Sequence, residues 1–150
     1  MDKNGILIVL SQSDRTSFGG DFGTQSTPQK VFSSIWSVES EVNNGGFSQY
    51  FLNSSGETAG FVVEALETIG APNTADICRR AIAIAFPDEL PSDSGAIGAA
   101  ASDFSDEVEE KLDALSEEFF GYPHDLTKLL FAYVSKHPEE FGELPEPDDA

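Results

Sequence analysis

The sequence predicts an all-α fold: a single compact domain of five or six helices. Apolar residues recur every three or four positions through much of the chain, which is the spacing that places them on one face of a helix. Segments rich in Gly, Pro and Asn separate these periodic stretches. No alternating run is long enough for a substantial sheet. Hydrophobic residues make up 39% of the 150 positions and include 12 Phe, so the chain can bury a core.

Three regions are expected along the chain: a loosely ordered N-terminal arm over 1–27, a helical domain over 28–141 and an acidic C-terminal tail over 142–150. The apolar run at 6–10 is short enough for a strand or a flap. Residues 11–27 are rich in Ser, Gly and Thr, a composition typical of loops. We therefore expect the arm to be poorly ordered or extended on the surface.

The first helix of the domain is expected to begin at Thr27-Pro28, because Thr can cap a helix and Pro suits its first turn. Its apolar pattern breaks at 43–46, where two Asn and two Gly tolerate a positive φ and can end a helix. A short aromatic helix over 47–52 and a polar turn over 53–56 should follow.

Four more helical segments are expected. The first two cover about 57–69 and 74–86, joined by a link in which Gly70 stops one helix and Asn73 caps the next. A linker over 88–102 precedes a strongly amphipathic helix, in which the apolar residues are Phe104, Val108, Leu112, Leu115 and Phe119. After a break at Gly121-Tyr122-Pro123, the last helix runs from about 124 or 125 to 135, and 139–141 can add one turn.

The charge excludes several classes of function. The formal net charge is −19 and the sequence pI is about 4.1. Proteins hold nucleic acid through Lys and Arg that displace counterions from the phosphates, so direct nucleic-acid binding is not expected. An anionic membrane surface is disfavoured for the same reason, and no apolar stretch approaches the roughly 20 residues of a spanning helix.

The acidic residues are clustered. Residues 88–118 contain eleven acids against one base, and residues 139–149 contain six acids and no base, so the two stretches hold sixteen of the nineteen net negative charges. Helical spacing stacks several of the first group into rows, where like charges repel. Such rows can present phosphate-like charge to a basic protein. The candidate partner-binding residues are Asp103, Asp106, Glu107, Glu109, Glu110, Asp113, Glu117 and Glu118.

Candidates for catalysis or metal binding are few. Cys78 is the only cysteine, so no intrachain disulfide is possible, and it is interpreted as a buried residue despite its neighbours Arg79 and Arg80. His124 and His137 fit no metal-binding helical spacing and are interpreted as residues of helix ends. No catalytic residue, metal site or cofactor is expected. The N-terminal apolar run is too short for a signal peptide, which predicts a cytoplasmic location.

The segment 36–56 is the most distinctive in the chain. Its motif is expected to be structural, with the aromatic residues filling the angle between helices and the polar ones satisfying backbone groups around a glycine turn. A pocket lined by Glu41, Asn44 and Gln49 is the alternative. The motif residues are Glu41, Asn43, Asn44, Gly45, Gly46, Phe47, Gln49, Tyr50, Phe51 and Asn53.

This motif, extended by Ala65-Leu66, by Ile69-Gly70-Ala71 and by the Ala-rich segment ending at Phe86-Pro87, resembles the bacterial DNA-mimic protein family over about residues 28–87. The resemblance implies an all-helical fold. It also implies a homodimer whose surface carboxylates imitate duplex DNA and occupy the DNA-binding face of a transcriptional repressor. The charged positions are not part of the motif, so the candidate partner-binding residues rest on charge density alone.

The leading hypothesis is therefore a non-enzymatic DNA mimic that binds a basic DNA-binding protein, such as a transcriptional repressor, and blocks its access to DNA. An immunity-type inhibitor of a basic nuclease toxin would use the same electrostatics and is the alternative. An enzyme of unknown reaction is the third possibility.

Overall fold

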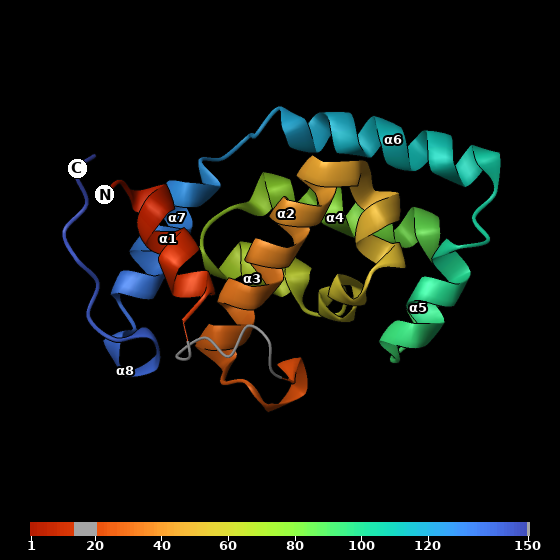
Figure 1. Ribbon diagram of the computed structural model, residues 1–150. Helices are drawn as coiled ribbons and strands as arrows, with labels where there is room; N and C mark the ends of the chain where they lie inside the picture. Colours follow the sequence, from red (N-terminus) through yellow and green to blue (C-terminus); the bar gives the residue numbers. More distant parts are fainter. Residues whose placement is uncertain (14–20, 150) are drawn as a thin grey trace.

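The computed structural model describes residues 1–13 and 21–149, and this part of the chain is all-helical (Figure 1). It contains eight α-helices and two short 3₁₀ helices and no strand, which confirms the predicted fold class and exceeds the predicted five or six helices. The elements are α1 (Lys3–Ser11), η1 (Phe22–Thr24), α2 (Thr27–Leu52), η2 (Ser54–Thr58), α3 (Val62–Thr68), α4 (Pro72–Ala85), α5 (Ser94–Ala101), α6 (Asp106–Phe120), α7 (Leu126–Ser135) and α8 (Pro138–Phe141).

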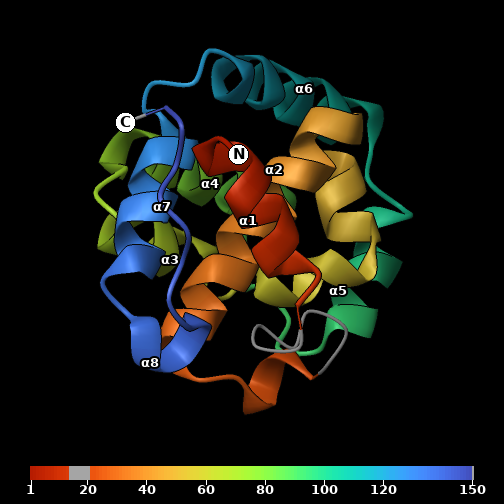
Figure 2. The same ribbon diagram turned by 60° about the vertical axis from the view of Figure 1, so that its left-hand side comes forward.

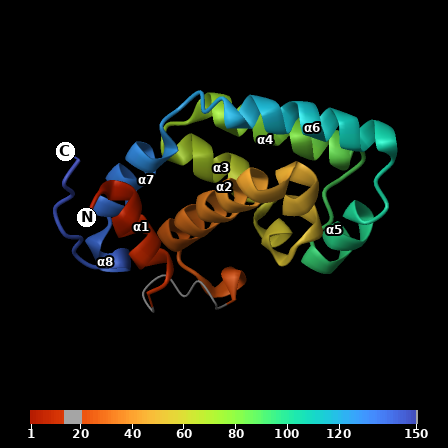
Figure 3. The ribbon, with the colours of Figure 1, turned by 45° about the horizontal axis from the view of Figure 1, so that its top comes forward.

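The long helix α2 runs through the middle of the molecule and contacts α3, α5, α6, α7 and α8 (Figure 1). Helix α6 packs on both α2 and α4, and Figure 3 shows it as a straight rod along α4. The core beneath α6 is aromatic: the ring of Phe47 meets that of Phe119 edge-on at 5.9 Å, and Phe51 meets Phe86 in the same way at 5.3 Å. No helix in the described part of the chain has both the length and the apolar character that a membrane crossing requires.

The N-terminal region differs from the expectation. Residues 3–11, predicted to belong to a poorly ordered or extended arm, form helix α1, whose first turn is capped by the side chain of Asp2. Ile6, Leu7 and Leu10 are buried, and α1 packs against α7. A run of five apolar residues does not distinguish a strand from a buried helix, and the contact with α7 decides for the helix. The prediction for 14–20 lies outside the described residues.

The predicted break in the first helix of the domain is present as a kink inside α2. Helical backbone lies on both sides of Gly46, whose φ of 82° and ψ of −179° are not helical, so the expected short aromatic helix is the part of α2 that follows the kink. The break is narrower than expected, because only Gly46 leaves the helical conformation. The positive φ expected in this segment is confirmed. The cap at the start is Ser26 rather than Thr27, because Ser26 and Gln29 bond each other's backbone N–H in a capping box.

The predicted helix over 57–69 is shorter in the structure. Residues up to Thr58 form η2 instead, where the hydroxyl of Thr58 pairs with that of Tyr50 in the core, and α3 begins only at Val62. The expected stop at Gly70 is confirmed: its φ is 91°, and the N–H groups of Gly70 and Ala71 bond back to the last turn of α3.

Asn73 does not cap α4, as had been expected. The helix begins at Pro72, so Asn73 lies inside its first turn and its backbone N–H donates to Nε2 of His124 at 3.2 Å. An imidazole contributed by the start of α7 therefore replaces the expected side-chain cap.

The predicted linker over 88–102 contains helix α5. Asp93 caps it, and a Cβ at Gly98 would lie 3.1 Å from the carbonyl oxygen of Leu52, so glycine permits its close approach to α2. Because α5 is rich in Gly and Ala, it has no clear apolar stripe to reveal it. Helix α6 begins at Asp106 rather than at 103, since Ser105 is its cap.

The end of the chain matches the expected elements but is not a loose tail. The predicted last helix and its additional turn are present as α7 and α8. Residues 142–149 then run as an extended segment beside α1 and α7 (Figure 2). Asp148 pairs with the amino group of Met1, and the backbone N–H of Lys3 donates to Asp149 at 2.8 Å. Part of the acidic C-terminal charge therefore fastens this segment to the N-terminal helix.

Candidate partner-binding surface

The bend of α2 joins the distinctive motif to the acidic helix α6. At the bend, the backbone N–H of Phe47 donates to Ser116 Oγ at 3.1 Å, and this hydroxyl in turn donates to the carbonyl of Leu112 at 3.0 Å. A Cβ added at Gly46 would lie 3.1 Å from the same Ser116 Oγ. The glycine therefore supplies both the backbone angle and the space that let α6 sit against α2.

The polar residues of the motif mostly bond one another. One oxygen of Glu41 accepts from the amide of Gln49 at 2.9 Å and from that of Asn53 at 2.7 Å. Phe47, Tyr50 and Phe51 are buried in the core. These contacts agree with the structural interpretation of the motif. They do not form the alternative pocket: Glu41 and Gln49 bond each other across the bend of α2, and Asn44 lines a groove that neither of them lines.

A second network connects α2 to the end of α6. Asn43 donates to the hydroxyl of Tyr122 at 2.6 Å, and this hydroxyl donates to Glu39 at 2.9 Å. Burial raises the pKa of Tyr122 to about 12 and raises the pKa of Glu39 above its usual value. Tyr122 has a φ of 45°, which is uncommon for a residue with a side chain. The network holds this strained residue at the sharp break between α6 and α7.

The two flanks of α6 are tied to the helices beneath them. On one flank, Arg80 of α4 makes a two-pronged bond to Glu118, with N–O distances of 2.8 and 3.1 Å, and the hydrogen bond lowers the pKa of Glu118. On the other flank, Ser48 of α2 donates to Glu109. Glu107 pairs with Lys111 at 3.1 Å. Three of the eight predicted partner-binding acids are thus used inside the molecule.

The remaining five predicted acids are exposed and make no ion pair with the described part of the chain. Asp103 precedes the helix. The other four stand in a single line along α6, because steps of four, three and four residues at about 100° each return to nearly the same side. This line lies opposite the buried residues Leu112, Leu115 and Phe119. We call it the crest; its residues are Asp106, Glu110, Asp113 and Glu117.

A groove of about 300 Å³ opens beside the crest, where α6 passes the bend of α2. Asn43 and Asn44 line one wall, and Asp113, Glu117 and Phe120 line the other. Asn44 was expected to line a pocket only together with Glu41 and Gln49, which do not line this groove, and Phe120 was not expected in a binding surface. The position of Phe120, three residues after Glu117, was the signal, because it places an aromatic ring on the polar face of the helix.

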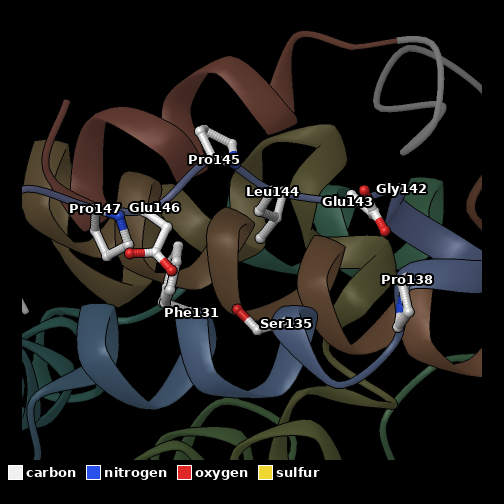
Figure 4. Close-up of a pocket in the computed structure, with 9 residues that line it drawn as sticks. All are labelled: Phe131, Ser135, Pro138, Gly142, Glu143, Leu144, Pro145, Glu146 and Pro147. Atoms are coloured by element: carbon white, nitrogen blue, oxygen red, sulfur yellow. The ribbon is translucent and has the colours of Figure 1, made fainter.

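Another hollow, of about 410 Å³, lies at the far end of the molecule (Figure 4). Phe131 and Ser135 of α7, Pro138 of α8 and the extended segment over 142–147 line it. Its only charged lining residues are Glu143 and Glu146, and none of the predicted site residues lies there.

The residues considered for catalysis occupy structural positions. Cys78 is buried, and burial raises the pKa of its thiol to about 12, which disfavours a reactive thiolate. The adjacent Arg79 and Arg80 bond acidic side chains instead. His137 Nδ1 lies 2.8 Å from the carbonyl oxygen of Tyr133. Within residues 1–13 and 21–149, no three His, Cys, Asp or Glu side chains gather closely enough to hold a metal ion.

Comparison with known proteins identifies the family. A sequence model described as DMP19-like protein, where DMP19 stands for DNA mimic protein 19, matches residues 24–137. The match spans about three quarters of the chain, and the chain belongs to this family. It includes the motif, α6 and α7 and leaves α1 and the extended C-terminal segment outside. Searches of curated proteins and of solved structures gave no match.

Proposed function

We propose that this DMP19-like protein is a DNA mimic that binds the DNA-contacting surface of a basic protein, such as a transcriptional repressor, and keeps that protein from DNA. The observation that carries the proposal is the crest: four exposed carboxylates in line on one helix, which make no ion pair with the described part of the chain because the adjacent Lys111 pairs with Glu107. Asp103 extends the same acidic surface beyond the start of α6.

The spacing of the crest supports this function. Four helical residues rise about 6 Å and three rise about 4.5 Å, so the crest spans about 16 Å. One DNA strand carries a phosphate about every 3.4 Å along the axis, so neighbouring crest carboxylates are separated by between one and two phosphate intervals. Carboxylates also accept hydrogen bonds from Arg and Lys as phosphate oxygens do.

The anchoring of α6 supports it further. Side-chain entropy and motion weaken a charged surface on a loose segment. Helix α6 is instead held by Ser116, which accepts from the backbone N–H of Phe47 on α2, and by Glu118, which accepts from Arg80 on α4. Two of the flank acids, Glu109 and Glu118, are therefore assigned to holding α6 on α2 and α4, whereas Glu107 pairs with Lys111 within α6 itself. The homodimer implied by the resemblance stays a prediction that light scattering of the purified protein would check.

The test is capture of a partner from a bacterial lysate at low salt, with and without competing duplex DNA. In the crest variant, Asp106→Asn, Glu110→Gln, Asp113→Asn and Glu117→Gln are combined. The matched control removes four charges elsewhere through Glu64→Gln, Glu139→Gln, Glu143→Gln and Glu146→Gln. Circular dichroism establishes that both variants are folded.

We expect the wild type and the control to capture a DNA-binding protein that duplex DNA and added salt displace. The crest variant should not capture it. Capture that survives in the crest variant, or that ignores the competing duplex, would overturn the proposal. The identity of the captured protein distinguishes a repressor from a nuclease and so decides between a regulatory and an immunity-type role.

A further inference from the structure

The groove beside the crest is lined by three kinds of groups. Two crest carboxylates, Asp113 and Glu117, stand on one wall next to the aromatic ring of Phe120. The opposite wall holds exposed Asn44, whose side chain makes no hydrogen bond with the described part of the chain. The groove thus offers negative charge, a ring face and a carboxamide within about 300 Å³.

Phe120 is the unexpected member of this set. Its side chain belongs to the last residue of α6 and is 42% exposed, although the aromatic residues Phe47, Phe51 and Phe119 nearby are buried. Steps of four and three residues put Asp113, Glu117 and Phe120 on one side of the helix. Leaving a large apolar ring in water among carboxylates gains nothing for folding, whereas the face of such a ring attracts a cation.

We propose that this groove receives an arginine side chain of the protein partner, with the guanidinium stacked on Phe120 and donating to Asp113 and Glu117. The inference rests on the proposed function, because a DNA-binding partner is the source of the arginine. Arginine fits better than lysine, since its planar guanidinium can stack on a ring and still donate from its edge to two acceptors. Proteins commonly contact phosphates and guanine edges through arginine, so a DNA-binding surface has such side chains exposed.

The arrangement gives the crest two functions. Asp106 and Glu110, away from the groove, supply charge alone and should accept lysine and arginine equally well. Asp113 and Glu117 act with the ring and should discriminate between them. The structure therefore places a specific contact at one end of a general electrostatic surface.

The experiment compares fluorescein-labelled hexa-arginine and hexa-lysine peptides by fluorescence anisotropy at moderate salt. We expect the wild-type protein to bind the arginine peptide about two- to fivefold more tightly than the lysine peptide, which corresponds to about 0.5–1 kcal/mol. Phe120→Leu keeps an apolar side chain but removes the ring, so it should abolish this preference by weakening the binding of the arginine peptide more than that of the lysine peptide. Phe120→Trp, with the stronger ring, should increase the preference.

The outcomes separate this inference from the proposed function. If Phe120→Leu retains the full preference for arginine, the inference is wrong, even where the crest variant still loses its partner in the lysate. If Phe120→Leu loses the preference but the crest variant still captures the DNA-binding protein, the groove binds arginine and the proposed function is wrong. A wild-type protein that binds both peptides equally would also overturn the inference.

Discussion

The two acidic regions of the molecule, α6 and the segment over 139–149, are alike in charge density and opposite in construction. Helix α6 is a straight rod (Figure 3) that is bonded along both flanks, and its four crest residues are exposed. The C-terminal segment has one turn of helix and then an extended chain, and its last acids, Asp148 and Asp149, bond the amino end of α1. The density of acidic residues in the sequence therefore does not show whether a segment exposes its charge to solvent or bonds another part of the protein.

The difference lies in where each region finds its cations. Along α6, Arg80 and Lys111 pair with acids at the flanks, which leaves the crest to solvent. At the C-terminal segment, the Met1 amino group and Lys3 meet the acids that end the chain. Pairing of the acids at the flanks thus holds α6 in place and leaves the crest acids exposed. Four variants test this comparison.

Gly46→Val should have the largest effect, because it attacks the bend on which α6 rests. The φ of 82° with an extended ψ is accessible almost only to glycine, so we expect a loss of about 2–3 kcal/mol in the free energy of unfolding, measured in urea. Gly60→Ala is the control, since its Cβ would meet only Leu90 at 3.9 Å. Equal stability of Gly46→Val and wild type would contradict the anchoring role of the bend.

Leu144→Ala probes the other region. Leu144 is half-buried against the core, and removing part of its side chain should cost about 1 kcal/mol. We expect Gly46→Val to lower the free energy of unfolding more than Leu144→Ala does. This order would mean that α6 depends on its contacts with the rest of the fold more than the C-terminal segment does. The same urea titrations give this ranking, and a reversed order would refute it.

Neutralising part of the crest should stabilise the protein slightly. Asp113 and Glu117 are like charges four residues apart, so Asp113→Asn with Glu117→Gln should raise stability by a few tenths of a kcal/mol at low salt. The matched pair Glu143→Gln with Glu146→Gln should change little, because an extended segment separates its charges. Thermal melts at low and high salt check both; a gain that persists at high salt would show that it is not electrostatic.

Glu39→Gln tests a carboxylate that lies outside the crest and makes no ion pair with the described part of the chain. Burial raises the pKa of Glu39 in the folded protein above its unfolded value, so the folded state binds its proton more tightly. This contribution stabilises the protein at low pH and is lost as pH rises through the folded pKa. The variant lacks this loss, so it should gain stability relative to wild type between pH 4 and pH 7. The free energy of unfolding of both proteins is measured in urea at several pH values in this range. A difference between them that does not change with pH would contradict the effect of burial on Glu39.

Much of the fold was predictable from local patterns. Helices α6 and α7 have regular apolar stripes, the positive φ expected within 43–46 is found at Gly46, and Gly70 ends α3 as expected. Helix α1 was missed because its five apolar residues suit a strand as well as a helix. Helix α5 was missed because small residues leave no stripe, and its position depends on Gly98 meeting α2.

Sequence alone determined the all-helical class, the bend in α2 and the concentration of charge, because periodicity, glycine and acidic residues act locally. Only the tertiary structure decided which acids are presented. Glu118 meets Arg80 from 38 residues away and Glu109 meets Ser48 from 61 residues away, and no local pattern encodes such pairs. The crest and its groove exist because α6 packs on top of both α2 and α4. Its flanks bond these two helices, and its outer face stays open to a partner.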